Sequence, residues 1–163
     1  MNTKKLLKQT PSSEVTEFQQ LLNKTFTSVY RLNLASGDEL HFLGDGFHYC
    51  FKHQQSCCED VYIESVTGDL KDLQGSEILK AEVYTKSFEG KENHYTYTFY
   101  KFATAKGYVD IRWCGSSNGY YSEDVGLYEV VSERDYKTKY NEWDFDSDYF
   151  PYLVFKTYMG LNV

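Results

Sequence analysis

The sequence predicts a mainly β protein with a minor helical part: a single antiparallel β domain, built as a sandwich or an open barrel. Three observations support this prediction. The chain has 163 residues, enough for one hydrophobic core without requiring a second. Aromatic residues make up 18% of it, and Tyr and Phe favour the half-buried surface of strands. Short strand patterns also follow one another across tight turns without crossover helices, which is typical of antiparallel pairing.

Three segments are expected along the chain: an N-terminal helix at 1–24, the antiparallel β domain at 25–131, and a C-terminal extension at 132–163. A cap at Pro11-Ser12-Ser13-Glu14, followed by apolar residues three to four apart, predicts an amphipathic helix that ends near Asn23. The apolar residues of this pattern are Val15, Phe18, Leu21 and Leu22.

The predicted strands are separated by turn residues such as Gly, Asn and Asp. A single helical turn is expected at 70–73. The strands are expected at 25–34, 39–43, 47–53, 61–64, 77–85, 95–104, 108–114 and 125–131.

The C-terminal extension mixes acidic and aromatic residues, most clearly from Trp143 to Asp148. Such a strip could occupy a basic groove on a partner protein. Alternatively, it is an extended segment that lies over the sheet with its aromatic side inward.

The first predicted hairpin brings together candidate metal ligands. With Asp45-Gly46 as a two-residue turn, His41 lies opposite Cys50, and His48 shares their face. Imidazole and thiolate suit zinc, and Asp45 or Cys57 could complete the set. The spacing does not match a paired CxxC signature, so histidines on a polar face beside a packed cysteine are the alternative.

The second predicted hairpin turns at Lys106-Gly107 and has an aromatic core face. Its reverse face carries Arg112 beside Asp110, among other residues. That arginine is either part of a surface ion pair or, on a concave sheet, a bidentate grip for a phosphate or carboxylate. The expected core pairs are Phe102 with Ile111 and Tyr100 with Trp113, and the reverse face also holds Lys101 and Ala103.

The stretch from Trp113 to Ser122 is the most distinctive of the chain, because it combines two glycines, an amide, hydroxyls and two tyrosines. Asn118-Gly119 favours a type I′ turn, which would make the stretch a hairpin between Trp113 and Tyr121. The functional alternative is a recognition loop in which Asn118, Tyr120 and Tyr121 contact a ligand or partner.

The segment from His53 to Asp60 holds the ingredients of a thiol nucleophile. Cys57 follows His53, and Glu59 could orient that histidine. No nucleophile elbow or oxyanion motif accompanies them, so cysteines packed as small apolar residues are the alternative. All four cysteines, Cys50, Cys57, Cys58 and Cys114, are expected as reduced thiols, because the protein is expected to be intracellular. The adjacent Cys57 and Cys58 could form only a strained bridge.

The net charge of −7 is unevenly distributed, with a local net charge of −6 between Glu123 and Asp148. This balance argues against direct binding of nucleic-acid phosphates, but it allows a basic partner or a DNA-mimic role. No run approaches the ~20 apolar residues of a membrane span. The basic start from Met1 to Lys8 lacks an apolar region after it, so a soluble, cytoplasmic protein is expected, with no membrane partner.

Several segments occur together in the order of a known family. They are His53 with Cys57 to Glu64, Thr67 to Ser76, Thr98 to Lys101, Lys106-Gly107, and Arg112 to Ser122. Over roughly residues 25–125 the chain resembles a family of small proteins of unknown function that is common in tailed-phage genomes. It departs from the family at residues 96–98, where family members often have a tryptophan and this chain has none. The resemblance implies a phage accessory protein in the infected bacterial cytoplasm, with no established active site, that counters host defence by occluding a host protein or sequestering a nucleotide signal.

The leading functional prediction is a non-enzymatic binding module without a cofactor, whose target is a host protein or a small nucleotide-like ligand. Its predicted surface comprises Arg112, Asn118, Tyr120 and Tyr121, with His53 beside them. An exposed strand edge could also pair two copies into a homo-oligomer.

Two alternatives come from other classes of function. One is a metal- or thiol-dependent enzyme, and the other is an acidic DNA-mimic inhibitor that works through 123–148. The enzyme would use His41, His48 and Cys50 with zinc, or His53, Cys57 and Glu59 with a thiolate.

Overall fold

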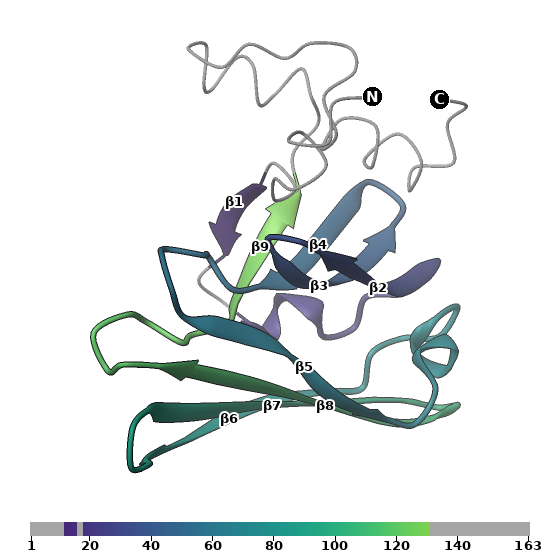
Figure 1. The fold of residues 1–163 in the computed structure, drawn as a ribbon. Helices are drawn as coiled ribbons and strands as arrows, with labels where there is room; N and C mark the ends of the chain where they lie inside the picture. Colours follow the sequence, from purple (N-terminus) through teal and green to yellow (C-terminus); the bar gives the residue numbers. More distant parts are fainter. Residues whose placement is uncertain (1–11, 16–17, 131–163) are drawn as a thin grey trace, which may run out of the picture.

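The computed structural model describes the backbone of residues 12–15 and the full structure of residues 18–130. Two antiparallel sheets pack against each other as a β-sandwich (Figure 1). The first sheet has the order β1-β9-β4-β3-β2 and the second the order β5-β8-β7-β6. The mainly β prediction is therefore confirmed, as a sandwich. The strands are β1 (Ser12–Val15), β2 (Ser28–Leu34), β3 (Gly37–Gly44), β4 (Phe47–Lys52), β5 (Asp60–Thr67), β6 (Lys80–Glu89), β7 (His94–Thr104), β8 (Gly107–Ser117) and β9 (Gly126–Val130).

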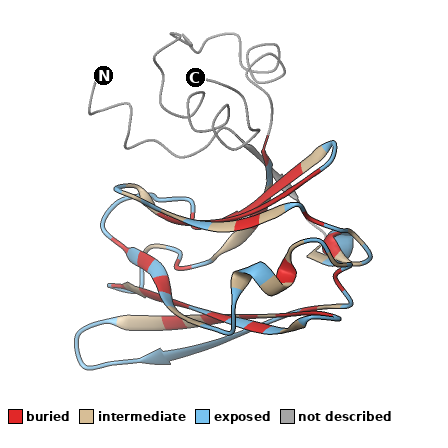
Figure 2. Cartoon of the chain, turned by 90° about the vertical axis from the view of Figure 1, so that its right-hand side faces the viewer, coloured by how far each residue is buried: buried red, intermediate tan, exposed pale blue. Residues whose placement is uncertain are grey.

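The core lies between the two sheets, where buried residues occur on strands of both (Figure 2). Seven of its 18 buried residues are aromatic. Phe42 and Phe51 of the first sheet meet Tyr100 and Phe102 of the second, and the Phe51 and Tyr100 ring centroids are 4.6 Å apart. Alternation along each strand places these rings on one face, since successive side chains point to opposite sides. Aromatic burial of this kind dominates the stability of such a core.

The register of the first hairpin is confirmed. Gly44 pairs with Phe47, and His41 pairs with Cys50, on either side of the two-residue turn Asp45-Gly46. Gly46 has a φ of +79°, a conformation that glycine adopts without strain. The helical turn expected at 70–73 is also present, as the 3-10 helix η3 (Leu70–Leu73).

The register of the second hairpin differs from the prediction by two residues. The turn is at Ala105-Lys106, so that Thr104 pairs with Gly107 and Tyr100 pairs with Ile111. The Thr104 hydroxyl accepts a hydrogen bond from the Lys106 amide and donates to the Asp72 carbonyl, which fixes the turn one residue earlier. Because the shift is even, the predicted core face survives.

The predicted N-terminal helix is wrong. Residues 12–15 form β1, which pairs with β9, and a single 3-10 turn, η2 (Phe18–Leu21), follows the undescribed residues 16–17. The helix-like apolar spacing reflects the burial of this one turn, since Phe18 packs on the rings of Phe51 and Tyr100. Asn23, with a φ of +65°, then reverses the chain.

The stretch around Asn118-Gly119 does not make the expected hairpin. A type I′ turn needs a positive φ at both central residues, and here only Gly119 has one. Instead, the Asn118 side-chain oxygen accepts a hydrogen bond from the Tyr120 amide at 2.9 Å, which is an Asx turn. The chain then crosses to the first sheet, where β9 pairs with β4.

The predicted C-terminal extension, including its acidic-aromatic strip, lies outside the described residues. Within the part of the chain that is described, no helix is both long and apolar enough to cross a membrane.

Candidate functional site

The predicted binding residues do not form one patch. Arg112 lies on the outer face of the second sheet, while Asn118, Tyr120 and Tyr121 belong to the loop after β8. His53 is buried and lines a third region, a hollow of about 660 Å³ between the sheets. The structure therefore separates three places that the sequence analysis treated as one surface.

The loop after β8 is held by a buried carboxylate. Glu123 accepts hydrogen bonds from the Ser117 hydroxyl at 2.5 Å and from Nδ1 of His94 at 2.8 Å. Tyr120 is 84% exposed, whereas Asn118 and Tyr121 border a hollow of about 210 Å³. The loop is thus anchored at its base and presents one exposed aromatic ring, that of Tyr120, which packs edge-on against Tyr121.

His53 is engaged by groups that hold its loop in place. Its Nδ1 donates to the Asp124 carbonyl at 2.7 Å, and its Nε2 lies 2.9 Å from Oε1 of Glu59. Burial alone would raise the pKa of Glu59, but hydrogen bonds from His53 and from the amides of Ser56 and Cys57 outweigh it and lower the pKa to about 2. These contacts indicate a structural role for the ring.

The thiol chemistry expected nearby is not supported. Cys57 and Cys58 are joined to each other, which contradicts the expectation of reduced thiols for these two residues. The amides of Ser56 and Cys57 donate to the Glu59 carboxylate, which holds the loop that carries both cysteines. Cys50 and Cys114 are free and buried, as expected for packed cysteines.

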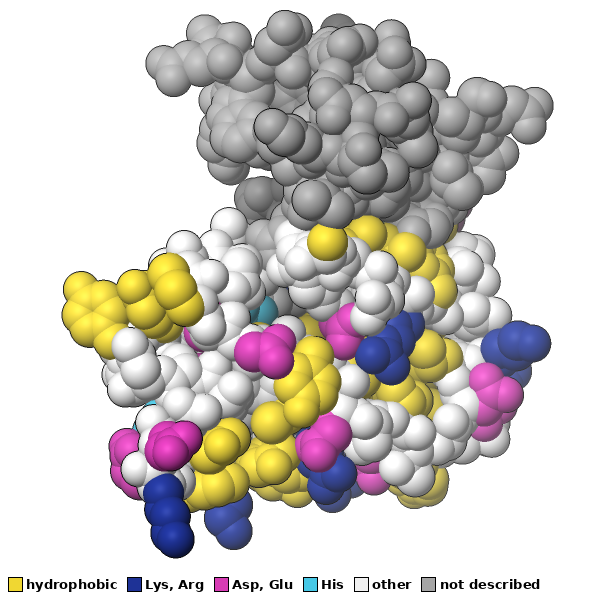
Figure 3. Space-filling view, in the orientation of Figure 1, with side chains coloured by type: hydrophobic (Ala, Val, Ile, Leu, Met, Phe, Trp, Pro, Cys, Tyr) yellow, Lys and Arg dark blue, Asp and Glu magenta, His cyan; other side chains and the backbone are white. Residues whose placement is uncertain are grey.

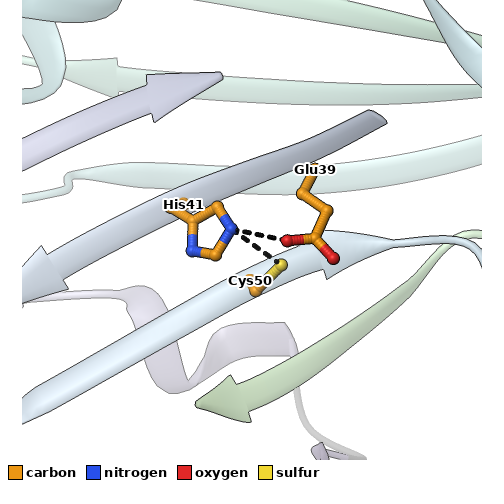
Figure 4. A group of neighbouring side chains, drawn as sticks. All are labelled: Glu39, His41 and Cys50. Carbon is orange, nitrogen blue, oxygen red and sulfur yellow. Dashed lines mark hydrogen bonds and ion pairs between the residues drawn. The ribbon is translucent and has the colours of Figure 1, made fainter. Parts of the chain in front are cut away.

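Glu39, His41 and Cys50, whose side chains can all bind a metal ion, form a cluster on the outward side of β3 and β4 (Figure 4). Nε2 of His41 is 2.9 Å from Oε1 of Glu39 and 3.6 Å from Sγ of Cys50. The three donor atoms all lie within 4.8 Å of one another, and all three residues are buried. His48, the other predicted ligand, instead contacts the far side of the imidazole, with its Nε2 2.8 Å from Nδ1 of His41.

Burial governs the protonation of this cluster. It lowers the pKa of His48 to about 3, helped by the neighbouring His41 and opposed by Glu39, so the His48 ring is neutral. Burial also raises the pKa of the Cys50 thiol well above its ordinary value, and the Glu39 carboxylate adds to that effect. A nucleophilic cysteine needs the opposite shift.

The outer face of the second sheet carries a row of aromatic side chains. Tyr84 and Phe88 of β6 pack on Tyr95, Tyr97 and Phe99 of β7, with near-parallel rings 4.5 Å apart for Tyr84 and Phe99. Along the lower edge of the molecule in Figure 3, hydrophobic side chains lie at the surface among basic and acidic ones. Exposed aromatic clusters of this kind mark interaction sites. This row is called the aromatic face below.

Arg112 stands beside the aromatic face. Its guanidinium lies 5.9 Å from the Tyr97 ring centre, and its Nε is 3.0 Å from the Glu64 carboxylate. The ion pair with Asp110 that was considered from the sequence is thus made with Glu64 instead. Arg112 is shared by two adjoining hollows of about 570 and 240 Å³. The larger hollow is lined by Lys86, Phe88, Tyr97, Phe99 and Arg112.

Sequence reasoning missed Glu39 and the aromatic face, although both had a signal. Glu39 lies two residues before His41, and residues two apart share a face of a strand. Tyr95, Tyr97 and Phe99 are also two residues apart and share one face of β7, while the core residue Tyr100 lies on the other face. The aromatic residues predicted from the sequence for this hairpin, Tyr100 and Phe102 among them, lie on the core side of β7.

A family model described as a domain of unknown function (DUF7448) matches residues 19–127. The match begins within η2 and ends within β9, so it covers the second sheet and the first sheet without β1 and the end of β9. It confirms that the chain resembles an uncharacterised family, over nearly the residues expected. No curated protein and no solved structure matches the chain.

Proposed function

The chain belongs to the DUF7448 family of domains of unknown function, and we propose that it is a non-enzymatic binding module for a small nucleotide-like ligand. One observation carries the proposal: the hollow on the aromatic face has three aromatic rings and two basic side chains in its lining. A nucleotide combines a flat ring with a negative charge, and both parts find a complement there.

The rings supply a stacking surface. The Phe88 and Tyr97 centroids are 5.7 Å apart with an interplanar angle of 21°, and Phe99 continues the row at 6.2 Å from Tyr97. A nucleobase stacked on such a side chain contributes about 1–3 kcal/mol to the binding free energy, whichever base it is. The strand pairing that fixes Phe99 beside Arg112 holds the rings and the cation at a constant spacing.

The cations supply the charge complement. The Arg112 side chain is 44% exposed and uses Nε for Glu64. Its guanidinium has further N–H donors that suit a phosphate. Lys86 stands across the hollow. The adjoining hollow adds the hydroxyl-bearing residues Ser65 and Thr67, which suit a ribose. Local cations can hold a small anion although the whole chain is acidic.

The family resemblance supports a biological setting for this activity. We propose that the module works in the cytoplasm of a phage-infected bacterium and counters host defence by sequestering a nucleotide signal. The alternative target within the same class, a host protein, would also use the exposed aromatic face.

Isothermal titration calorimetry with ATP, NAD, ADP-ribose and cyclic dinucleotides tests the proposal. We expect the wild type to bind at least one of them, and Arg112→Ala to weaken that binding about 10- to 100-fold, the loss of one or two charge-assisted hydrogen bonds. Arg112→Lys should be intermediate, because it keeps the charge and loses the planar fork.

Lys71→Ala is the matched control, because Lys71 is exposed on η3 and does not line either hollow. Its affinity should equal that of the wild type. Absence of binding to every nucleotide, together with Arg112-dependent capture of a bacterial protein, would show that the target is a protein and that the nucleotide proposal is wrong.

A second candidate function is metal binding at Glu39, His41 and Cys50, and the donor set favours it. Carboxylate oxygen, imidazole nitrogen and thiolate sulfur all bind zinc, and ligand atoms around a tetrahedral zinc are about 3.3–3.8 Å apart. The distance of 3.6 Å between His41 and Cys50 fits, and the pair His41 and Glu39 at 2.9 Å would need to open slightly. His48 is placed to accept the Nδ1 proton of His41, a common arrangement behind a metal-bound histidine.

Elemental analysis of protein purified without chelators and dialysed against zinc tests this second candidate. About one zinc per chain is expected, with loss of the metal in His41→Ala and Cys50→Ala. Cys114→Ala is the control, since Cys114 is a buried free cysteine in the other sheet. A wild type that retains no zinc would leave the three residues as a hydrogen-bonded network. Because the ligands are buried, a bound zinc would be structural rather than catalytic.

A further inference from the structure

The edge of the second sheet at β6 differs from the other sheet edges. β6 pairs with β7 over ten consecutive positions, from Lys80 to Glu89, without a register shift. Its other edge has no strand partner among the described residues. The strand contains no proline and no bulge, two of the devices that prevent a strand edge from pairing. It does carry charged side chains, a third such device, so a partner strand must match their pattern.

The other three edges are short, irregular or capped. β1 has four residues. β5 has a register shift between Ile63 and Ser65, and its Ile63 amide donates to Asp38. On β2, the Val29 amide donates to the Gln74 side chain. β6 is therefore the edge best suited to accept another strand.

The side chains of β6 are also unusually apolar for an exposed strand. Val83, Tyr84 and Phe88 are 43%, 49% and 44% exposed. Every residue from Glu82 to Glu89 is exposed. Large apolar side chains on a long free edge indicate a surface that a partner covers.

The pattern of charges along β6 suits a second copy of the same strand as its partner. When the strand is placed antiparallel to a copy of itself with Tyr84 opposite Tyr84, each Glu82 faces the Lys86 of the other copy. Opposite charges directly across an antiparallel pair stabilise it, and like charges destabilise it. The neighbouring registers centred on Glu82 or Lys86 place like charges opposite each other. Self-pairing about Tyr84 forms two such ion pairs related by a twofold axis. A register centred on Ala81 would also place Lys80 opposite Glu82 twice, but it pairs only residues 80–82 of β6.

We propose that two copies of this chain associate through β6, antiparallel and centred on Tyr84, to form one continuous eight-stranded sheet. Backbone hydrogen bonds across the twofold axis join the strands, and Lys80 to Phe88 of each copy pair with the same residues of the other. The two aromatic faces then lie side by side on one surface. The interface is small, so the Kd is expected on the order of micromolar.

Sedimentation velocity of the full chain, over about 1 to 300 µM around that expected Kd, tests the proposal. The wild type should change from monomer to dimer in this range. Glu82→Lys and Lys86→Glu should each raise the Kd at least about tenfold, because each places two like-charged pairs across the interface. The double variant Glu82→Lys/Lys86→Glu should restore the dimer, since it exchanges the two members of each pair.

Lys91→Glu and Glu92→Lys are the matched controls, because both residues are exposed in the turn after β6 and lie outside the paired segment. They should dimerise as the wild type does. Circular dichroism checks that each variant is folded. In the double variant the lysine that replaces Glu82 still lies opposite Lys101 of β7, so rescue cannot come from improved folding. A monomeric wild type, or a dimer that ignores the single reversals, would overturn the proposal.

Discussion

Replacement of Asp38 by Ala is expected to lower the free energy of unfolding by about 3–5 kcal/mol, because three hydrogen bonds to a buried carboxylate are lost. The Asp38 side chain is 3% exposed and lies at the start of β3. Its carboxylate accepts hydrogen bonds from Arg31 at 3.0 Å, from Asn33 at 2.7 Å and from the Ile63 amide at 2.7 Å.

The location of Asp38 makes the effect large. Arg31 and Asn33 belong to β2 of the first sheet, whereas Ile63 belongs to β5 of the second. A single carboxylate therefore joins the two layers of the sandwich. Its loss leaves three donors without their acceptor, and buried donors without partners are costly.

Urea denaturation monitored by fluorescence measures the change, with Asp60→Ala as the control. Asp60 is exposed on β5, so its replacement should change stability by less than about 0.5 kcal/mol. Asp38→Asn should be intermediate, because its amide nitrogen would face a donor. Equal stability of the Asp38→Ala and Asp60→Ala proteins would show that the carboxylate does not join the sheets.

The second large effect concerns Glu59 and pH. Its pKa is about 2 in the folded protein, against an ordinary value of 4.5. Since the folded pKa is the lower one, the ionised carboxylate stabilises the fold above pH 4.5, and this contribution is lost as the pH falls from there through about 2. The shift corresponds to roughly 3 kcal/mol at neutral pH.

Glu59→Gln should therefore be less stable than the wild type by about 3 kcal/mol at pH 7, with the difference shrinking towards zero near pH 2. Urea denaturation at several pH values measures it. Glu92→Gln, at an exposed turn position, controls for the loss of one negative charge and should leave the wild-type profile unchanged. A difference between wild type and Glu59→Gln that is independent of pH would contradict the assigned pKa.

The parts of the fold that could be predicted are those fixed by residues close together in the sequence. The turn at Asp45-Gly46 sets the register of its hairpin, so the pairing of His41 with Cys50 followed from the sequence. Asn118-Gly119 has equally strong turn residues, yet the chain there leaves the second sheet for the first. That path is fixed by the buried contact of Ser117 with Glu123, which no local pattern reveals.

The candidate site was predicted only in part, for a related reason. Arg112 was identified on the reverse face of its strand, and the structure places it there. Its partners Phe88 and Lys86 come from β6, whose predicted range ended at Thr85 and thus omitted both. The site arises where three strands lie side by side, and strand order is a property of the whole sheet.

The strand order also determines when each sheet can form during synthesis. β5 to β8 are consecutive in the chain, so the second sheet can pair as soon as they have emerged. The first sheet can pair β2, β3 and β4 early, but it is completed only later, because β9 lies between β1 and β4 and is the last described strand. Contacts between distant segments form slowly. A nascent chain that stops before Gly126 therefore presents the unpaired edge of β4, a point of contact for chaperones or for other unfinished chains.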